Sequence, residues 1–236
     1  MPNGKLHLIP TTLGGNESIK RVLPDYNHLL VHKIDIFIVE QIRTARRFLK
    51  AIAHPVAIDA MTFYELNKHS DLNTISRYIN PLLEGKNIGL LSEAGTPCVA
   101  DPGAMIVAMA HEKGIEVIPL VGPNSIILAL MGSGFNGQHF VFHGYLPIES
   151  NQRNKKIKEL ESAVYRQDQT QIFIETPYRN NTMLETLIKL LKPETKICVA
   201  ADLTLETEFI KTLPARLWKK QMPELHKRPV VFLVYK

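Results

Sequence analysis

The sequence has little of what marks a secreted, metal-binding or membrane protein. Cys98 and Cys198 are the only cysteines among its 236 residues, so neither a disulfide framework nor a cysteine metal site is indicated. The nine histidines show no metal-ligand spacing, and we expect no metal. The N-terminus lacks the charged and then apolar segments of a signal peptide, and no apolar run approaches the roughly 20 residues of a membrane span. These absences predict a cytoplasmic protein with no membrane partner.

Two common catalytic signatures are also missing. There is no Walker loop for a nucleoside triphosphate and no Gly-x-Ser-x-Gly elbow of a hydrolase. Gly132-Ser133-Gly134 follows a predicted helix rather than a strand, and we interpret it as a helix end. The sequence has 45% apolar residues, 22% charged residues and a formal net charge of +5. This composition is typical of a globular protein, and the charge allows a polyanionic partner without requiring one.

The first half of the chain alternates short apolar segments with loops and helical patterns. We expect strands at 6–9, 34–39, 87–91 and 116–120, and helices at 43–49, 71–84 and 104–111. Strand, loop, helix and strand at this short spacing are typical of a parallel α/β sheet. The first half is therefore predicted to be an α/β domain of residues 1–120.

The second half has a different pattern. After a linker at 121–124, helices are expected at 125–131, 151–165 and 179–191, and strands at 139–143, 171–175, 196–201 and 229–235. Strands that follow one another without a helix between them are typical of antiparallel pairing. We predict an α+β domain of residues 121–236 with a mixed sheet.

One loop carries most of the functional signal. Residues 90–103 read Leu-Leu-Ser-Glu-Ala-Gly-Thr-Pro-Cys-Val-Ala-Asp-Pro-Gly and begin at the carboxyl end of a predicted strand, where parallel sheets bind ligands. Gly95 permits a positive φ or a close backbone approach, and the side chains of Thr96 and Glu93 can hydrogen-bond a ligand. Asp101, before Pro102, is interpreted as a helix N-cap.

A second motif, Pro119-Leu-Val-Gly-Pro-Asn-Ser125, opens a predicted helix whose free N–H groups could hold a carboxylate. Together the two motifs resemble those of the tetrapyrrole-methylase superfamily, and most closely the branch that methylates a ribose of small-subunit ribosomal RNA. Weaker matches follow in order along the chain: Ile9–Gly14, Glu40–Arg43, Tyr64–Asn67, Tyr145–Pro147, Glu175–Arg179 and Ala201–Thr204.

The resemblance implies a two-domain tetrapyrrole-methylase fold, a homodimer and S-adenosyl-L-methionine (SAM) as the cofactor. It implies a methyltransferase that acts on a ribose 2'-hydroxyl of ribosomal RNA or of the small ribosomal subunit. It places the cofactor in the crevice between the two domains, in contact with Leu13, Glu93, Gly95, Thr96, Pro123, Ser125, Ile126, Glu175, Ala201 and Pro229.

The acceptor side departs more from the family's pattern. Glu40 and Glu65 are the candidates for removing a proton from a ribose hydroxyl, with Arg43 orienting a phosphate, and each could instead belong to a structural ion pair. Gln41 and Ile42 stand where the pattern has an acid and a threonine. Two alternatives therefore stay open: a methylase of another RNA or of a small molecule, and a SAM- or RNA-binding protein without turnover.

Basic residues form two groups. Arg43, Arg46, Arg47 and Lys50 fall at helical spacing and would share one face, which could bind phosphates or simply be solvated. The second group, Arg153, Lys155, Lys156 and Lys158, is followed by acids, and we interpret it as a solvated face.

Overall fold

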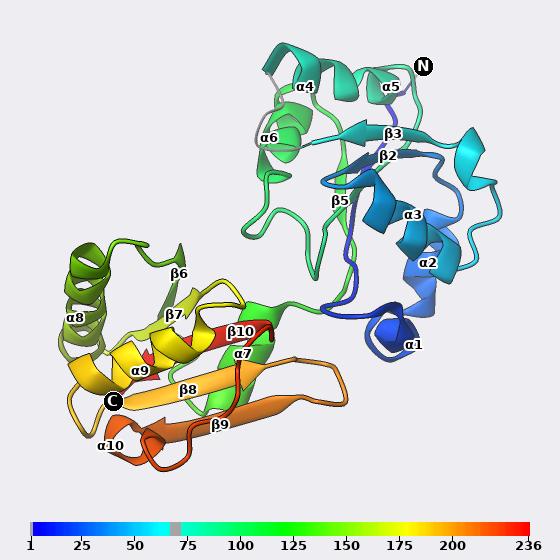
Figure 1. Cartoon of the computed structure of the whole chain (residues 1–236). Helices are drawn as coiled ribbons and strands as arrows, with labels where there is room; N and C mark the ends of the chain where they lie inside the picture. Colours follow the sequence, from blue (N-terminus) through cyan, green and yellow to red (C-terminus); the bar gives the residue numbers. More distant parts are fainter. Residues whose placement is uncertain (1, 67–71) are drawn as a thin grey trace. The chain divides into compact units, whose positions relative to one another are not determined.

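The computed structural model describes residues 2–66 and 72–236, so Asn67 of the Tyr64–Asn67 match lies outside the described residues. The chain divides into two compact units, Met1–Asn124 and Ser125–Lys236, each built on its own five-stranded sheet (Figure 1). The division falls four residues beyond the boundary expected from the sequence.

The sheet of the first unit is entirely parallel, as predicted. Its strands lie in the order β3-β2-β4-β1-β5. Their bounds are β1 (Leu6–Ile9), β2 (Ile36–Val39), β3 (Thr62–Glu65), β4 (Ile88–Leu91) and β5 (Val117–Pro119). The edge strand β3 was not predicted, because its half-exposed Thr-Phe-Tyr-Glu sequence offers no continuous apolar run.

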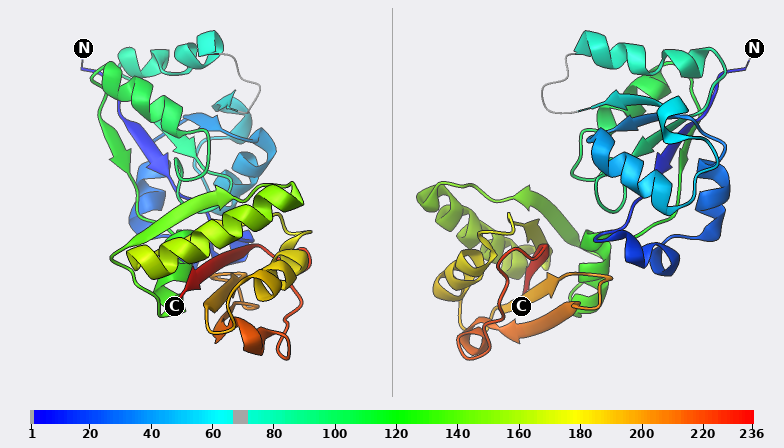
Figure 2. Two further views of the ribbon diagram at one scale, coloured as in Figure 1. Left: turned by 90° about the vertical axis from the view of Figure 1, so that its left-hand side faces the viewer. Right: turned by 45° about the vertical axis from the view of Figure 1, so that its right-hand side comes forward.

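Helices cover both faces of this sheet (Figure 2). Phe37 and Val39 of β2 pack in a core with α1 (Ile19–Val22), α2 (Asp25–Val31) and α3 (Ile42–Ala51). Ile36 and Ile38 pack on the other face with α4 (Leu72–Tyr78), α5 (Asn80–Leu83) and α6 (Ala104–Glu112). Side chains alternate between the two faces of a strand, so one continuous apolar run serves both cores.

The helix expected at 71–84 is two helices. A turn at Ile79 separates α4 from α5, and Pro81 lies in the first turn of α5. Because proline has no N–H to donate and its ring clashes with the preceding turn, it ends the first helix and starts the second. Short 3₁₀ turns, η1 (Asn16–Ser18) and η2 (Ile58–Ala60), complete the first unit.

The sheet of the second unit is mixed, as predicted, in the order β6-β7-β10-β8-β9. Only β6 and β7 pair in parallel. The bounds are β6 (Phe140–Tyr145), β7 (Thr170–Ile174), β8 (Lys196–Ala201), β9 (Phe209–Pro214) and β10 (Val230–Tyr235). The sequence did not predict β9, whose six residues are all half-buried.

Four helices flank this second sheet. The helices α8 (Ser150–Gln167), α9 (Asn180–Leu190) and α10 (Ala215–Trp218) share one core with it, and α7 (Ser125–Ser133) contacts β8, β9 and β10. Residues 132–137 read Gly-Ser-Gly-Phe-Asn-Gly, an order also found in dinucleotide-binding loops. Here α7 ends at Ser133 and Gly134 follows with a φ of +73°, so the segment ends a helix, as predicted.

Candidate active site

The predicted site residues of the first unit lie at one edge of its parallel sheet. The chain leaves β1 at Pro10, β2 at Glu40, β3 at Leu66 and β4 at Ser92. Parallel strands end on the same side, so these four exits meet at the carboxyl edge, where open α/β sheets bind ligands.

The loops after β1 and β4 are joined by a two-way backbone contact. The N–H of Thr11 donates to the carbonyl of Gly95 at 3.0 Å, and the N–H of Gly95 donates to the carbonyl of Thr12 at 3.3 Å. The buried hydroxyl of Ser92 also donates to the Gly95 carbonyl. The two loops therefore form one rigid wall.

Gly95 is packed too tightly to carry a side chain. Its φ is +71°, and a Cβ built on it would lie 2.8 Å from Cδ2 of Leu13 and 3.0 Å from the carbonyl oxygen of Pro123. The side-chain amide of Asn124 donates to the hydroxyl oxygen of Thr96 at 2.6 Å. Four predicted cofactor residues, Leu13, Gly95, Thr96 and Pro123, thus lie together in the first unit.

Glu93 connects the same wall to α3. Its Oε1 accepts hydrogen bonds from the N–H of Gln41 at 3.1 Å and from the hydroxyl of Thr44 at 2.7 Å. Gln41 is the N-cap residue of α3 and makes no side-chain cap of its own, so the carboxylate of Glu93 caps this helix from another loop. This role did not follow from the sequence, because the cap lies about 50 residues away from the helix.

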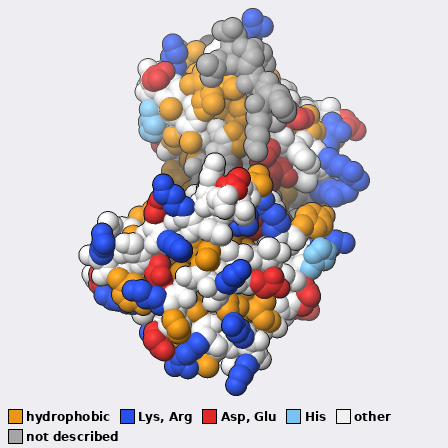
Figure 3. Space-filling model, turned by 60° about the vertical axis from the view of Figure 1, so that its left-hand side comes forward, with side chains coloured by type: hydrophobic (Ala, Val, Ile, Leu, Met, Phe, Trp, Pro, Cys, Tyr) orange, Lys and Arg blue, Asp and Glu red, His pale blue; other side chains and the backbone are white. Residues whose placement is uncertain are grey.

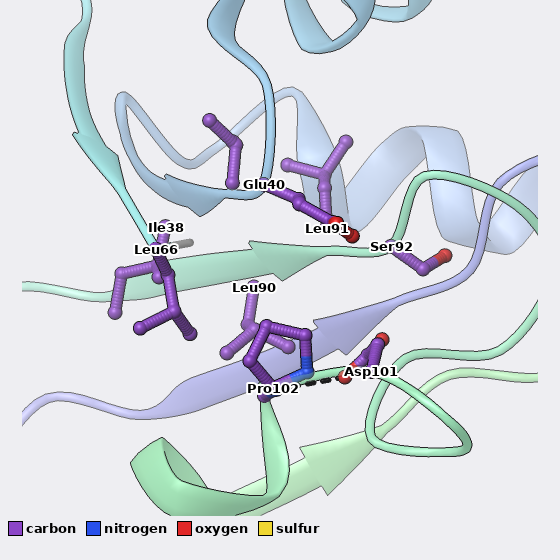
Figure 4. A pocket seen from close by; sticks show the side chains of 10 residues that line it. Ile38, Glu40, Leu66, Leu90, Leu91, Ser92, Asp101 and Pro102 are labelled. Carbon is purple, nitrogen blue, oxygen red and sulfur yellow. Dashed lines mark hydrogen bonds between the residues drawn. The ribbon is translucent and has the colours of Figure 1, made fainter. Parts of the chain in front are cut away.

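A narrow pocket lies beside Glu40. Its volume is about 10 Å³, which is room for roughly one water molecule. In Figure 4 the side chain of Glu40 extends past Leu91 in the direction of Ser92, and Asp101 and Pro102 form the opposite wall.

The sequence predicts Asp101 as the N-cap of α6, but in the structure Asp101 does not cap this helix directly. The N-cap of α6 is Gly103, and Asp101 Oδ1 accepts from the N–H of Cys98 at 2.9 Å and of Gly103 at 2.7 Å, so it closes the preceding turn. Burial raises the pKa of Asp101 above its ordinary value, although these two N–H groups act in the opposite direction. Because a carboxyl with a raised pKa in a pocket is often functional, Asp101 is a further candidate for the site. The sequence had indicated only a capping role for it.

The turn that holds Asp101 is strained. Cys98 and Ala100 have φ of +67° and +63°, which non-glycine residues seldom adopt and which is frequent at functional sites. Burial raises the pKa of the Cys98 thiol to about 11, so this cysteine is protonated at neutral pH and is a weak nucleophile.

The other two predicted catalytic residues lie at the same edge and are exposed. Glu65 is the last residue of β3, paired in register with Val39, so it neighbours the exit to Glu40. Arg43 lies in the first turn of α3, directly after Gln41 and Ile42. The sheet therefore gathers Glu40, Arg43 and Glu65 on adjacent segments.

A larger hollow opens between the loop after β1 and α3. It has a volume of about 240 Å³ and shares Ser92 with the Glu40 pocket. It is lined by Thr11, Thr12, Gly14, Gly15, Asn16, Thr44, Ala45, Arg47, Phe48, Ser92 and Glu93. The sequence pointed to Arg47 only as one of four basic residues.

In the second unit, the predicted residues lie at strand ends and at a helix start. Ser125 and Ile126 open α7, Ala201 ends β8, and Pro229 directly precedes β10. Glu175 follows β7 with its side chain 1% exposed.

Glu175 accepts from the guanidinium of Arg179 at 2.5 Å and from the N–H of Thr176 at 2.6 Å. Nε of Arg179 and Oγ1 of Thr204 are buried, and neither has a hydrogen-bond partner among the described residues. Buried polar atoms normally find a partner, and these two belong to the segments that carry Glu175 and Ala201. A polar ligand would satisfy both atoms. Arg179 and Thr204 belong to the segments Glu175–Arg179 and Ala201–Thr204, which the family resemblance had already marked.

The second basic group lies on α8 and behaves as a solvated face. Arg153 donates to the carbonyl of Ile148, and Lys156 pairs with Glu159 at 3.9 Å. On the face of the second unit drawn in Figure 3, basic and acidic side chains are interspersed rather than gathered by sign. Among the residues that the structure describes, no group of His, Cys, Asp and Glu could hold a metal ion, and no helix is long and apolar enough to cross a membrane.

A parallel α/β unit with the tightly packed Gly95 loop at its carboxyl edge, followed by a unit with a mixed sheet, is also the architecture of a solved methyltransferase. The family model described as tetrapyrrole (corrin/porphyrin) methylases matches residues 30–217. The chain belongs to this family, and it is a methyltransferase.

Relatives and solved structures agree with this assignment. The ribosomal RNA small subunit methyltransferase I of Vibrio cholerae serotype O1 is 32% identical over 240 residues, which cover 100% of this chain and 79% of that protein. The protein of the same name from Bacillus subtilis is 33% identical over 88% of this chain and 67% of its own length. The methyltransferase CobJ has the same fold, with a TM-score of 0.64 at 17% identity over 99% of both chains. The uroporphyrin-III-C-methyltransferase of Thermus thermophilus gives 0.54 at 17% identity over 99% of this chain and 92% of its own.

Proposed function

We propose that this methyltransferase uses SAM to methylate a ribose 2'-hydroxyl of small-subunit ribosomal RNA. The observation that carries the proposal is the wall of Leu13, Gly95, Thr96 and Pro123 beside the Glu40 pocket, in a chain that belongs to a methylase family. The choice of acceptor is supported by the names of relatives that align over most of the chain.

The residues present fit SAM as the cofactor. The first unit offers backbone groups and the Thr96 hydroxyl, in a wall where only glycine fits at position 95. The second unit offers two buried polar atoms, on Arg179 and Thr204, that have no partner among the described residues. SAM carries a carboxylate, an ammonium group, a ribose diol and an adenine, which can pair with such groups. Leu13, Glu93, Gly95, Thr96, Pro123, Ser125, Ile126, Glu175, Ala201 and Pro229 remain the proposed cofactor residues.

When bound, SAM supplies an electrophilic methyl group on a sulfonium that is already a good leaving group. The protein's own contribution is to align the acceptor and to remove a proton from it. Glu40 is proposed to take the proton of the ribose hydroxyl, because it lines a pocket with room for little more than one water. Arg43 is proposed to hold a neighbouring phosphate, and Glu65 remains the second candidate for the base.

The family resemblance suggests two further properties. A ribosomal substrate would place the enzyme in the cytoplasm, with the small ribosomal subunit as its partner. The enzyme is also proposed to act as a homodimer. Light scattering should give about twice the 26.7 kDa of one chain, and a monomer at micromolar concentration would reject the dimer.

Methyl transfer with a choice of acceptors tests the proposed function. The protein and methyl-labelled SAM are incubated with small-subunit ribosomal RNA, with small ribosomal subunits and with a panel of tetrapyrrole-like small molecules. Label should enter the RNA or the subunit. Label in a small molecule alone would mean that the acceptor is a small molecule rather than RNA. SAM binding without methyl transfer to any of these acceptors would indicate a binding protein.

A further inference from the structure

The hollow between the loop after β1 and α3 has one wall that offers a free positive charge. Arg47 lines the hollow, and the described residues form no ion pair, hydrogen bond or ring contact with it. Arg46, its neighbour on α3, is instead directed away: it pairs with Asp59 at 3.8 Å and lies 5.5 Å from the centre of the Phe63 ring. The structure thus separates two adjacent arginines that the sequence could only group together.

The surroundings of Arg47 favour an anion. Four basic residues and no acid lie on the ten residues of α3, and Arg43 is one helical turn before Arg47. Lys20 and Arg21 lie on α1, which follows the loop of the opposite wall along the chain. Such a cluster of cations raises the local concentration of polyanions.

Glu93 is the one acid among the described residues that line the hollow, and the carboxylate of Glu17 lies against Gly15 at its edge. Glu93 already has partners. Oε1 of Glu93 accepts from the N–H of Gln41 and from the hydroxyl of Thr44. Two donors at the start of α3 thus occupy this oxygen. The hydroxyls of Thr11, Thr12 and Thr44 donate to oxygens of their own walls, which leaves their oxygens as acceptors toward sugar hydroxyls. The lining is therefore suited to a sugar as well as to an anion.

The size and position of the hollow suit a piece of nucleic-acid backbone. Its volume of about 240 Å³, against about 10 Å³ for the one-water pocket beside Glu40, is more than a single ion needs. Because Ser92 lines both spaces, a phosphate in the hollow would lie next to a ribose at Glu40.

We infer that this hollow binds a sugar–phosphate unit of the acceptor RNA, with Arg47 as its phosphate contact. The inference rests on the proposed function for the identity of the nucleic acid. Contacts to phosphates position a chain without reading its sequence, so the site should bind RNA backbone of any sequence and set the register of the ribose to be methylated.

The test compares Arg47→Ala with Arg46→Ala, which removes the same charge from the next position outside the hollow. Binding of a labelled oligouridylate is measured over a series of salt concentrations, with inorganic phosphate as a competitor in one arm. Calorimetry with SAM and thermal unfolding check the cofactor site and the fold. The KM for small-subunit RNA and the kcat are measured in parallel.

Arg47→Ala should weaken oligouridylate binding about tenfold and lower the salt slope by about 0.7, the value for one contact to single-stranded nucleic acid. It should raise the KM for RNA with little change in kcat or SAM affinity. Arg47→Lys should recover part of the affinity, and Arg46→Ala should change neither the affinity nor the slope.

Equal losses for Arg47→Ala and Arg46→Ala would overturn the inference, since a general charge effect would then suffice. No oligouridylate binding by the parent protein would also overturn it, as would displacement of the RNA by inorganic phosphate at equimolar concentration, which would indicate a site for free anions. Binding that depends on Arg47 without methylation of any RNA would support the site and reject the proposed function, so the two failures are distinguishable.

Discussion

The hydroxyl of Thr44 donates a 2.7 Å hydrogen bond to the carboxylate of Glu93, which joins α3 to the loop after β4. The N–H of Gln41 donates to the same oxygen at 3.1 Å. Glu40 immediately precedes Gln41 and lines the small pocket. A residue proposed as a cofactor contact therefore also holds the turn that carries the proposed base.

Replacement of Glu93 separates these two roles. Glu93→Ala should destabilise the protein by about 1 kcal/mol, as expected for the loss of a helix cap, and should lower kcat. Glu93→Gln keeps an oxygen for both donors and should retain stability and most of kcat. Urea unfolding and steady-state kinetics measure these effects. A large loss of SAM affinity in Glu93→Gln at normal stability would instead show that the negative charge binds the ammonium group of SAM.

Gly95→Ala should be far more damaging than Gly114→Ala. Both glycines have positive φ, +71° and +64°, but a Cβ on Gly114 meets no described residue within 4 Å, whereas one on Gly95 meets Leu13 and Pro123. Gly114→Ala should therefore cost only the backbone strain, about 1 kcal/mol, and bind SAM normally. Gly95→Ala should cost about 2–4 kcal/mol through the added clash and weaken SAM binding. Equal unfolding midpoints and SAM affinities would show that this wall does not need its glycine.

Asp101→Asn should change how stability depends on pH. Burial raises the pKa of Asp101, so the folded protein holds this proton more tightly than the unfolded chain. The resulting stabilisation is present below the ordinary pKa of aspartate and is lost as the pH rises through the raised pKa.

Asparagine keeps an oxygen for the N–H groups of Cys98 and Gly103 and never ionises. The stability of Asp101→Asn relative to the parent should therefore increase between about pH 4 and pH 7, as followed by urea unfolding midpoints at both pH values. A difference that is constant, or that decreases with pH, would mean that the Asp101 carboxylate is not penalised by burial.

Glu40→Gln should reduce kcat by about 100-fold or more, the usual contribution of a positioned general base, with SAM affinity unchanged. Glu65→Gln should cause a smaller loss, because Glu65 is exposed at the end of an edge strand whereas Glu40 lines the pocket. Kinetics at saturating SAM, with calorimetry as the binding control, compare the two. A larger loss for Glu65→Gln would move the proposed base from β2 to β3.

The strands that are buried on both faces could be predicted from the sequence, as could the half-exposed strands β5 and β6, whereas β3 and β9 could not. The segments around Phe37 and Leu90 are continuous apolar runs because each strand serves two cores. The edge strands β3 and β9 lack such runs, since polar residues interrupt their apolar ones.

The location of the candidate site could be predicted, but its internal contacts could not. Gly95 marked the loop, yet the atoms that require a glycine there belong to Leu13 and Pro123, which are distant in sequence. The sequence also does not distinguish Arg46 from Arg47. Their difference depends on Asp59, which pairs with Arg46, and on the distant loops that form the hollow beside Arg47.

The position of the transferred methyl group tests the central claim most directly. Small ribosomal subunits that lack the modification are treated with the protein and methyl-labelled SAM, and the RNA is then hydrolysed with alkali. A methyl group on a ribose 2'-oxygen blocks cleavage at that nucleotide, so the label should be recovered in an alkali-resistant dinucleotide. The Glu40→Gln protein should give far less of it. Label on a base, released in mononucleotides, or no label in RNA at all, would contradict the account.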